Sequence, residues 1–289
     1  MGREKVICIT GGSGFLGRHL IPYLSDNTDF RIKFLTRQKT RLFSSLKNVE
    51  QVIGNLQDPP TLVGFLEEEC IFCHLAYLKS ATPDDNFRVI ENLLLISSEA
   101  KIERFIHCST AVVVGKFWSK WVTESTSCKP TCVYEQSKLE IENILLEKNK
   151  LSFPITVLRP TAVFGEGGNN LKLHINNLIA NSAVKNYLVK SLFSDRQFNL
   201  VSVEDVVQAI TFLATTTHSI DKEIFIIASD EEITNNYSYI TGRIESIFNI
   251  ATLRLPLIKL PKIVLFFIFI AIGRFNQTPY RCYSSIKIE

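Results

Sequence analysis

The sequence lacks several features that mark whole classes of protein. It has no run of five or more basic residues and a net charge of only +3, so nucleic acid is not an expected partner. Its seven cysteines follow no framework spacing in a chain of 289 residues, which favours a reducing compartment over a disulfide scaffold. A strand pattern starts at Val6, leaving no room for a signal peptide. We therefore expect a cytoplasmic protein.

One cysteine pattern needs a separate interpretation. The pattern is Cys70-Ile71-Phe72-Cys73-His74. It matches the Cys-x-x-Cys-His motif of covalent haem attachment, and its Cys-x-x-Cys part matches the motif of redox-active dithiols. The segment has the pattern of a buried strand, however, in which residues three apart point to opposite faces. We therefore interpret both cysteines as small core residues, and we expect no metal site.

The hydrophobic pattern alternates between apolar strands and amphipathic helices. The expected strands are Val6–Thr10, Arg31–Thr36, Glu50–Ile53, Ile71–Ala76, Arg104–Ser109, Ile155–Leu158 and Ile224–Ala228. The expected helices are Leu16–Leu24, Thr61–Glu68, Phe87–Ala100, Val133–Glu147 and Leu171–Ala180. This alternation, with strands that are almost continuously apolar, predicts an α/β fold with a parallel sheet covered on both faces.

The pattern also suggests two units. Residues 1–160 carry the alternation, and residues 198–230 return to it after an irregular stretch. We predict that these two segments form the sheet domain. Residues 161–197 and 231–289 are expected to form a smaller C-terminal lobe for the substrate. The lobe is expected over the carboxyl ends of the strands, where open α/β sheets bind ligands.

A glycine-rich turn, Thr10-Gly11-Gly12-Ser13-Gly14-Phe15-Leu16-Gly17, joins the first expected strand to the first helix. Gly11 permits a tight turn, Gly14 lets the backbone approach a pyrophosphate, and Gly17 lets helix and strand pack closely. The N-terminus of the helix faces the phosphates. This context predicts a dinucleotide site on a doubly wound Rossmann sheet.

A second motif carries the expected chemistry. Tyr134 and Lys138 stand four residues apart on the expected helix 133–147, so their side chains share one face. A free phenol has a pKa of about 10, and a nearby ammonium and the positive charge of a nicotinium ring both favour the phenolate and lower that pKa. Thr110, at the end of the fifth strand, supplies a hydroxyl for the same substrate oxygen. These residues predict a proton-transfer centre.

The motifs resemble, in type and order, the short-chain dehydrogenase/reductase superfamily, and specifically its extended branch of NAD(P)-dependent epimerases, dehydratases and ketoreductases. The resemblance covers about the first 210 residues. Its further landmarks are Gly54-Asn55-Leu56-Gln57-Asp58, His74-Leu75-Ala76, Asn86, Asn92-Leu93-Leu94, Ser109-Thr110, Leu158-Arg159-Pro160 and Val203-Glu204-Asp205.

The resemblance implies roles for individual residues. Tyr134 would be the general acid/base, Lys138 would hold the nicotinamide ribose, and Thr110 would hydrogen-bond the substrate oxygen. Hydride would pass between the cofactor and a carbinol or carbonyl carbon. The implied cofactor-binding residues are Gly11, Ser13, Gly14, Phe15, Leu16, Gly17, Arg37, Asn55, Leu56, Leu75, Ala76, Tyr134, Lys138 and Pro160.

Arg37 bears on the choice of cofactor. It follows the second strand, where an acidic residue would bind the adenosine ribose hydroxyls and favour NAD, whereas an arginine suits a 2′-phosphate. Lys39 and Arg41 add positive charge nearby. The pattern favours NADP, with NAD as the alternative if this is only a solvated basic loop.

The resemblance predicts an oxidoreductase or epimerase that acts on a secondary alcohol or ketone. The favoured substrate position is C4 of a nucleotide sugar. Two departures weaken the sugar assignment. Val114 stands where the family usually has tyrosine, and Phe198 stands where nucleotide-sugar epimerases often have an arginine for the diphosphate; Arg196 could replace it. The alternatives are a lipid or small-ketone reductase like the 3β-hydroxysteroid dehydrogenases, and a non-catalytic NAD(P)-binding protein.

The C-terminal tail is unusual. From residue 251 onward it has six basic residues and one acidic residue, Glu289. The run Ile263–Ile272 has ten apolar residues, half of the roughly 20 needed to cross a bilayer, so a spanning helix is not expected. The alternatives are burial, a homodimer contact, or peripheral membrane contact through residues 253–274.

Overall fold

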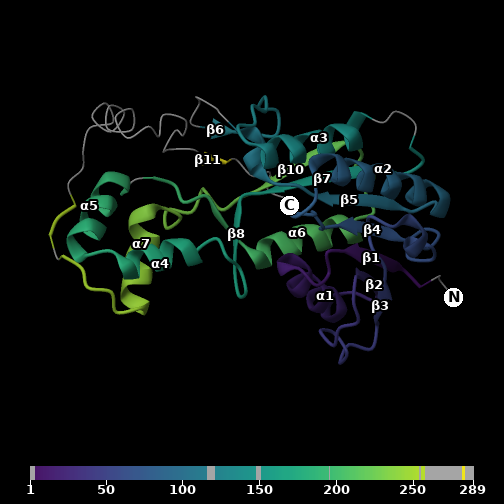
Figure 1. The fold of residues 1–289 in the computed structure, drawn as a ribbon, viewed down its shortest axis with the longest axis horizontal. Coiled ribbons are helices and arrows are strands. Elements are labelled where there is room, and N and C mark those ends of the chain that lie inside the picture. The colour runs from purple at the N-terminus through teal and green to yellow at the C-terminus, as the bar shows by residue number, and fades with distance from the viewer. Residues whose placement is uncertain are drawn as a thin grey trace.

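Seven strands form one parallel sheet in the order β10-β7-β5-β4-β1-β2-β3 (Figure 1). The computed structural model describes residues 4–115, 121–147, 151–194, 196–253 and 255–257, and the backbone of 282–283. The strands are β1 (Val6–Thr10), β2 (Arg31–Thr36), β3 (Val49–Ile53), β4 (Ile71–His74), β5 (Arg104–Cys108), β7 (Ile155–Pro160) and β10 (Glu223–Ile227). The chain changes direction across the sheet between β1 and β4, which is the ligand-binding point of a Rossmann fold.

Strand β1 shows why both faces of the sheet are buried. Its five residues, Val-Ile-Cys-Ile-Thr, are all shielded from solvent. Ile7 and Ile9 belong to one core cluster, whereas Val6 and Cys8 belong to a second. Because successive side chains of a strand point to opposite faces, a continuous apolar strand needs a cover on each side. The predicted α/β class and doubly wound sheet are confirmed.

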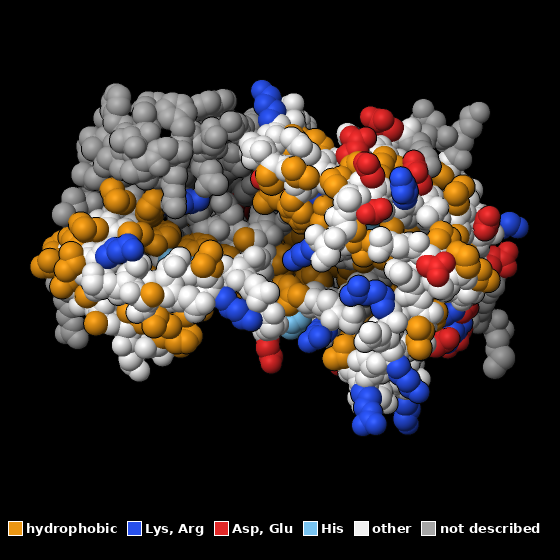
Figure 2. Space-filling model, viewed as in Figure 1, with side chains coloured by type: hydrophobic (Ala, Val, Ile, Leu, Met, Phe, Trp, Pro, Cys, Tyr) orange, Lys and Arg blue, Asp and Glu red, His pale blue; other side chains and the backbone are white. Residues whose placement is uncertain are grey.

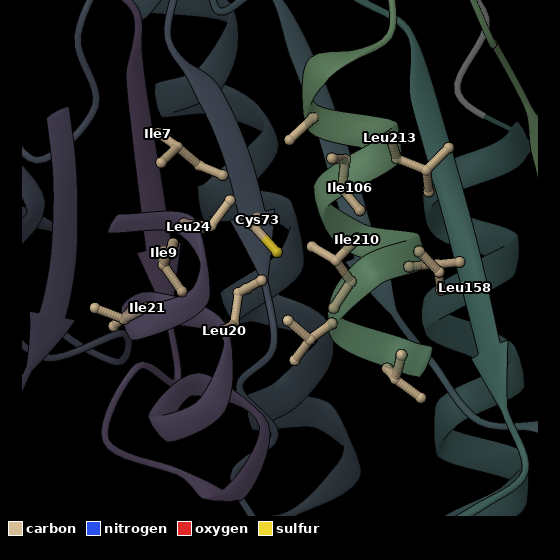
Figure 3. Packing of buried hydrophobic residues seen from close by; sticks show 14 of the residues in the cluster. Ile7, Ile9, Leu20, Ile21, Leu24, Cys73, Ile106, Leu158, Ile210 and Leu213 are labelled. Carbon is tan, nitrogen blue, oxygen red and sulfur yellow. The ribbon is translucent and has the colours of Figure 1, made fainter. Parts of the chain in front are cut away.

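Four helices supply those covers. On one face, α1 (Phe15–Asn27) and α6 (Val203–Thr215) pack against each other and the sheet. Figure 3 shows this cluster, with Leu20 and Leu24 of α1 and Ile210 of α6 next to strand residues such as Ile9. On the other face lie α2 (Pro83–Ala100) and α3 (Val133–Glu147), which also pack together.

The two cysteines of the Cys-x-x-Cys-His pattern lie in different core clusters. Cys70 packs in the cluster beneath α2 and α3, and Cys73 packs in the cluster beneath α1 and α6. Both are buried free thiols. The interpretation of both as core residues is confirmed.

The remaining elements extend from the carboxyl edge of the sheet. The strands β8 (Ala162–Phe164) and β9 (Leu200–Ser202) form a parallel pair, and β6 (Trp121–Val122) pairs with β11 (Cys282–Tyr283). Three further helices of the described residues lie together at the end of the molecule remote from β3 (Figure 1). They are α4 (Lys172–Ala180), α5 (Ala183–Phe193) and α7 (Tyr237–Ile247). The division into a sheet domain and a substrate lobe stays a prediction.

The prediction of one helix is wrong. The segment Thr61–Glu68 was expected to be helical, but the structure has only a short 3₁₀ turn, η1 (Pro59–Leu62), followed by turns. Gly64 has φ +76°, a left-handed conformation that interrupts a right-handed helix. Leu62 and Phe65 are nevertheless buried against the sheet. The apolar spacing therefore reflected burial of an irregular segment.

The tail falls largely outside the described residues. The apolar run 263–272, on which the expected dimer or membrane contact depends, belongs to the part that the structure does not describe. Within the described residues, no helix has both the length and the apolar character needed to traverse a bilayer.

Candidate active site

The glycine-rich turn leaves β1 and reaches the start of α1 with backbone groups in close contact. Gly11 has φ +75°, and a Cβ there would lie 2.9 Å from the backbone N of Ala76. A Cβ on Gly17 would lie 2.5 Å from the carbonyl oxygen of Gly11 and from two backbone atoms of Gly12. Since backbone atoms cannot move aside as a flexible side chain can, both positions require glycine.

The N-terminus of α1 has the features of an anion-binding site. Its N-cap is Gly14, no side chain caps the helix, and its first turn has no acidic residue. The first amides of a helix have no partner within the helix, and they carry its partial positive charge. At Gly14 a Cβ would fill the space beside the carbonyl of Gly11, at 3.1 Å. These residues fit the pyrophosphate of a dinucleotide.

The other cofactor residues predicted from the sequence lie where strands end. Leu75 and Ala76 follow β4, and the amide of Leu75 donates a hydrogen bond to the carbonyl of Thr10 at 3.1 Å. Asn55 and Leu56 follow β3, Arg37 follows β2 and is exposed, and Pro160 is the last residue of β7. In a parallel sheet all these ends share one edge, which is also the edge of the glycine turn.

The helix α3 presents Tyr134 and Lys138 on one face. The side chain of Tyr134 is 41% exposed, so its phenol is open to a ligand. Lys138 is buried, and its Nζ donates a hydrogen bond to the carbonyl of Cys108, the last residue of β5, at 3.0 Å. Burial lowers the pKa of Lys138, and Cys108 and Glu142 oppose that shift.

The pKa of Tyr134 differs from the expectation. The adjacent ammonium and a bound nicotinium were together expected to lower it. With the ammonium alone, the pKa is raised above the usual value for tyrosine. Burial is the largest cause, followed by the thiol of Cys108 and the phenol of Tyr77. The amine of Lys138 is engaged with the carbonyl of Cys108 instead. The phenol is therefore protonated at neutral pH.

Thr110 lies just beyond β5, at the start of a short 3₁₀ turn, η2 (Ala111–Val114). It caps this turn, because its Oγ1 accepts a hydrogen bond from the amide of Val112 at 3.4 Å. The turn packs against α3. Thr110 therefore belongs to the same sheet edge as Tyr134 and Lys138, with a half-buried hydroxyl that is weakly held.

Sequence reasoning missed a buried polar network beneath this helix. Glu142, one turn after Lys138, forms an ion pair with Arg159 of β7, with Arg159 Nη2 2.5 Å from Glu142 Oε2. Arg159 Nε also donates to both carboxylate oxygens, and the hydroxyl of Ser109 donates to Oε1. Glu142 and Arg159 side chains are 1% and 4% exposed. The available signal was an arginine near the end of a largely apolar strand.

Tyr77 was missed as well. It follows Ala76 directly, and its ring lies edge-to-face with the ring of Tyr134, with 5.2 Å between centroids. Its hydroxyl donates to Ser137 Oγ at 3.2 Å, and Lys138 Nζ lies 5.3 Å from its ring centroid. An aromatic residue directly after the predicted Leu75-Ala76 contact was the signal for it.

His74 has a structural environment. Its Nδ1 shares a hydrogen bond with Thr10 Oγ1 at 2.6 Å, and its ring stacks on His107. Burial, and then the charge of Lys138, lower its pKa to about 3. The ring is therefore neutral at physiological pH and joins the ends of β1 and β4.

The chain resembles known proteins in sequence. A model of the NAD dependent epimerase/dehydratase family matches residues 7–228. Among curated proteins, 28% identity is found to a 4-hydroxy-2-methyl-3-oxo-4-farnesyl-3,4-dihydroquinoline-1-oxide ketoreductase from Stigmatella aurantiaca, over 54% of this chain and 50% of that protein. GDP-6-deoxy-D-talose 4-dehydrogenase from Aggregatibacter actinomycetemcomitans is 28% identical over 69% of this chain and 66% of its own length. The matches thus span less than two thirds of these relatives.

Solved structures show the same fold at low identity. dTDP-glucose 4,6-dehydratase from Bacillus anthracis, in complex with NAD, has a TM-score of 0.68 at 19% identity, covering 86% of this chain and 82% of that one. UDP-glucuronic acid 4-epimerase from Bacillus cereus, with UDP-glucuronic acid and NAD, has a TM-score of 0.66 at 20% identity, covering 89% and 87%. Since the family model matches well over half of the sequence, the chain belongs to the NAD dependent epimerase/dehydratase family, within the extended short-chain dehydrogenase/reductase branch.

Proposed function

We propose that this protein is an NAD(P)-dependent oxidoreductase of secondary alcohols and ketones that works in the reductive direction, with C4 of a nucleotide sugar as the first candidate substrate position. One observation carries the proposal. An exposed, protonated phenol, Tyr134, lies on the same helix face as Lys138. The amine of Lys138 reaches the carboxyl end of β5, and the glycine turn leaves the same end of the sheet at β1. A phenol that is protonated at neutral pH is equipped to donate its proton to a carbonyl oxygen.

The residues of the chain divide the work. The glycine turn and the uncapped start of α1 would hold the pyrophosphate, and Lys138 would hold the nicotinamide ribose. When bound, the nicotinamide supplies the hydride for the carbonyl carbon. Tyr134 would donate a proton from its hydroxyl to the carbonyl oxygen, and Thr110 Oγ1 would hydrogen-bond that oxygen. The network around Glu142 would keep α3 seated on β7.

For the cofactor, we propose NADP as the preferred form, with NAD as the alternative. Arg37, Lys39 and Arg41 are exposed in the segment that follows β2. Figure 2 shows Lys and Arg side chains gathered on the protruding end of the molecule, over the segment between β2 and β3. An exposed arginine after β2 supports a contact with the 2′-phosphate, because its guanidinium can pair with the phosphate in a bidentate manner.

Two substrate classes have support, nucleotide sugars and lipid-like ketones. Relatives of known activity include several nucleotide-sugar enzymes, such as the GDP-6-deoxy-D-talose 4-dehydrogenase. Phe198, in the expected place of a diphosphate-binding arginine, stacks on Tyr237 and contacts His174. The guanidinium of Arg196 lies over the ring of Phe193 at 5.7 Å. This aromatic cluster supports the second candidate, a reductase of lipid-like ketones, as does similarity to the farnesyl-dihydroquinoline ketoreductase.

The test is a turnover screen. Small molecules that copurify with the protein are identified by mass spectrometry, and the protein is then incubated with NADPH or NADH and with 4-keto sugars linked to UDP, dTDP or GDP, or with apolar ketones. We expect NAD(P)H to be consumed in proportion to alcohol product. Tyr134→Phe should bind the dinucleotide and lose turnover by on the order of 10²–10⁴-fold. Interconversion of sugars with no net cofactor consumption would reject net reduction in favour of epimerisation, and equal turnover by the Tyr134→Phe variant would reject the role of Tyr134.

Three further expectations stay proposals. A homodimer and a peripheral membrane contact through residues 253–274 both depend on a segment that lies mostly outside the described residues. Leu253 and Leu255, which are described, are exposed and available to either contact. A cytoplasmic location stays a prediction from cysteine usage.

A further inference from the structure

Tyr77 occupies a position between the cofactor-facing edge of the sheet and the helix α3. It lies three residues after the end of β4 and directly after Ala76, whose backbone contacts Gly11 of the glycine turn. The side chain is half-buried. Tyr77 is therefore connected through its backbone to the glycine turn, and through its side chain to α3.

Three contacts join the Tyr77 side chain to α3. The ring meets the ring of Tyr134 at an interplanar angle of 87°, the edge-to-face geometry that is one of the two preferred arrangements of aromatic pairs. Lys138 Nζ lies 5.3 Å from the centroid of the same ring, within the range at which an ammonium is attracted to an aromatic face. The hydroxyl donates to Ser137 Oγ. One side chain thus contacts three residues of a single helix face.

Among the described residues, the ring of Tyr77 is one of two groups that contact the amine of Lys138. The first is the hydrogen bond to the carbonyl of Cys108, which comes from β5. The second is the ring of Tyr77, which comes from the loop after β4. A lysine side chain has four rotatable bonds, so an amine held from two sides is confined to a much smaller region than one held by a single hydrogen bond.

We propose that Tyr77 is a positioning residue of the active site, which orients the ring of Tyr134 and holds the amine of Lys138 where a nicotinamide ribose would be bound. This inference rests on the proposed function. Tyr77 acts through Tyr134 and Lys138, and its own hydroxyl is engaged with Ser137. The aromatic ring carries the effect and the hydroxyl is secondary, so phenylalanine should replace tyrosine and an aliphatic residue should not.

The experiment compares Tyr77→Phe, Tyr77→Leu and the parent protein in binding NADPH and NADH, measured by fluorescence titration. A cation–π contact and an aromatic pair have free energies that correspond to an affinity change of about three- to tenfold. Tyr77→Leu should weaken binding by this factor, and Tyr77→Phe should stay within about twofold of the parent. Tyr239→Leu, which removes an exposed tyrosine from α7, is the matched control and should leave dinucleotide binding unchanged.

A double-mutant cycle separates positioning from general damage. If Tyr77 acts through Lys138, Tyr77→Leu should change affinity by less than about twofold in a Lys138→Ala background. Equal losses in both backgrounds would overturn the proposal, and so would equal affinities of the Phe and Leu variants. Tyr77→Met, which is flexible and lacks a ring, serves in place of Tyr77→Leu if circular dichroism shows that the leucine variant is unfolded.

A measurement without ligand distinguishes failure of the proposed function from failure of the role of Tyr77. The ultraviolet titration of Tyr134 is obtained as the difference between each protein and its Tyr134→Phe counterpart. The charge interaction with Tyr77 is one of the causes that raise the pKa of Tyr134, so Tyr77→Leu should lower the pKa of Tyr134. If the parent bound no dinucleotide, the proposed function would fail, whereas the titration would still judge Tyr77. If the parent bound but Tyr77→Leu changed neither binding nor titration, the role of Tyr77 alone would fail.

Discussion

Removal of Glu142 is the perturbation whose outcome the structure constrains most. Its carboxylate accepts hydrogen bonds from Arg159 Nε, Arg159 Nη2 and the hydroxyl of Ser109, in a site where both charged side chains are almost fully buried. Burial alone would lower the pKa of Arg159, but the hydrogen bond and charge of Glu142 raise it. Glu142→Leu would leave a buried guanidinium without its counter-charge.

The expected magnitude follows from that geometry. Breaking a buried ion pair by removing one partner costs about 3–5 kcal/mol, because the remaining charge stays desolvated. Glu142→Leu and Arg159→Met should therefore each lower the free energy of unfolding by that amount, or Tm by on the order of 10 °C. The double variant removes both charges together, so its loss should fall to about 1–2 kcal/mol, chiefly from the unpaired hydroxyl of Ser109.

Urea unfolding followed by circular dichroism measures these changes. Glu50→Gln is the control, because Glu50 pairs with Arg31 at 3.1 Å with side chains that are 52% and 30% exposed, and such a pair contributes under about 1 kcal/mol. Two results would refute the reasoning. One is a loss of less than about 1 kcal/mol for either single variant. The other is a double variant whose loss equals the sum of the two single losses.

Three other predictions concern the cofactor site and its chemistry. Arg37→Asp should shift the ratio of NADPH to NADH affinity at least about tenfold towards NADH, since it replaces a phosphate partner by a repelling charge; an unchanged ratio in the binding titration would contradict the assignment. Gly17→Ala should abolish dinucleotide binding or cost about 1–3 kcal/mol of stability, because its Cβ would lie 2.5 Å from backbone atoms; normal binding and an unchanged urea midpoint would contradict it. The phenol of Tyr134 should titrate above the usual tyrosine pKa of about 10 in the ligand-free protein. The rate of reduction should therefore be maintained at neutral pH and fall as the pH rises through the raised pKa of Tyr134. A Tyr134 pKa below the usual tyrosine value in the difference titration would contradict this prediction.

The parts of the site that the sequence predicted are the local ones. The interval between Tyr134 and Lys138 places two side chains on one helix face whatever surrounds the helix. The turn from Gly11 to Gly17 similarly depends on a strand and a helix that are adjacent in the chain, and the structure has both. The roles given to these residues stay predictions, whereas their arrangement is as expected.

The parts that were missed depend on residues remote in sequence. Tyr77 meets Tyr134 across 57 positions of chain, and Arg159 meets Glu142 across 17 positions and two different elements. The effect of Lys138 on the pKa of Tyr134 depends on a remote group in the same way, because the carbonyl of Cys108, which holds the amine of Lys138, comes from another strand. No periodicity in a single segment records which groups a folded sheet brings together.

The sequence by itself determined the class of the fold and the end of the parallel strands at which the glycine turn lies and the active site is predicted. Continuous apolar strands such as β1 need cover on both faces, and glycines at the first turn leave room only for backbone and ligand. Tertiary structure alone decided that the segment after Pro59 packs without a long helix, that Glu142 neutralises a buried arginine, and that the ring of Tyr77 contacts both Tyr134 and Lys138. The physical reason is that hydrophobic periodicity is a property of neighbours in the chain, whereas desolvation and charge depend on neighbours in space.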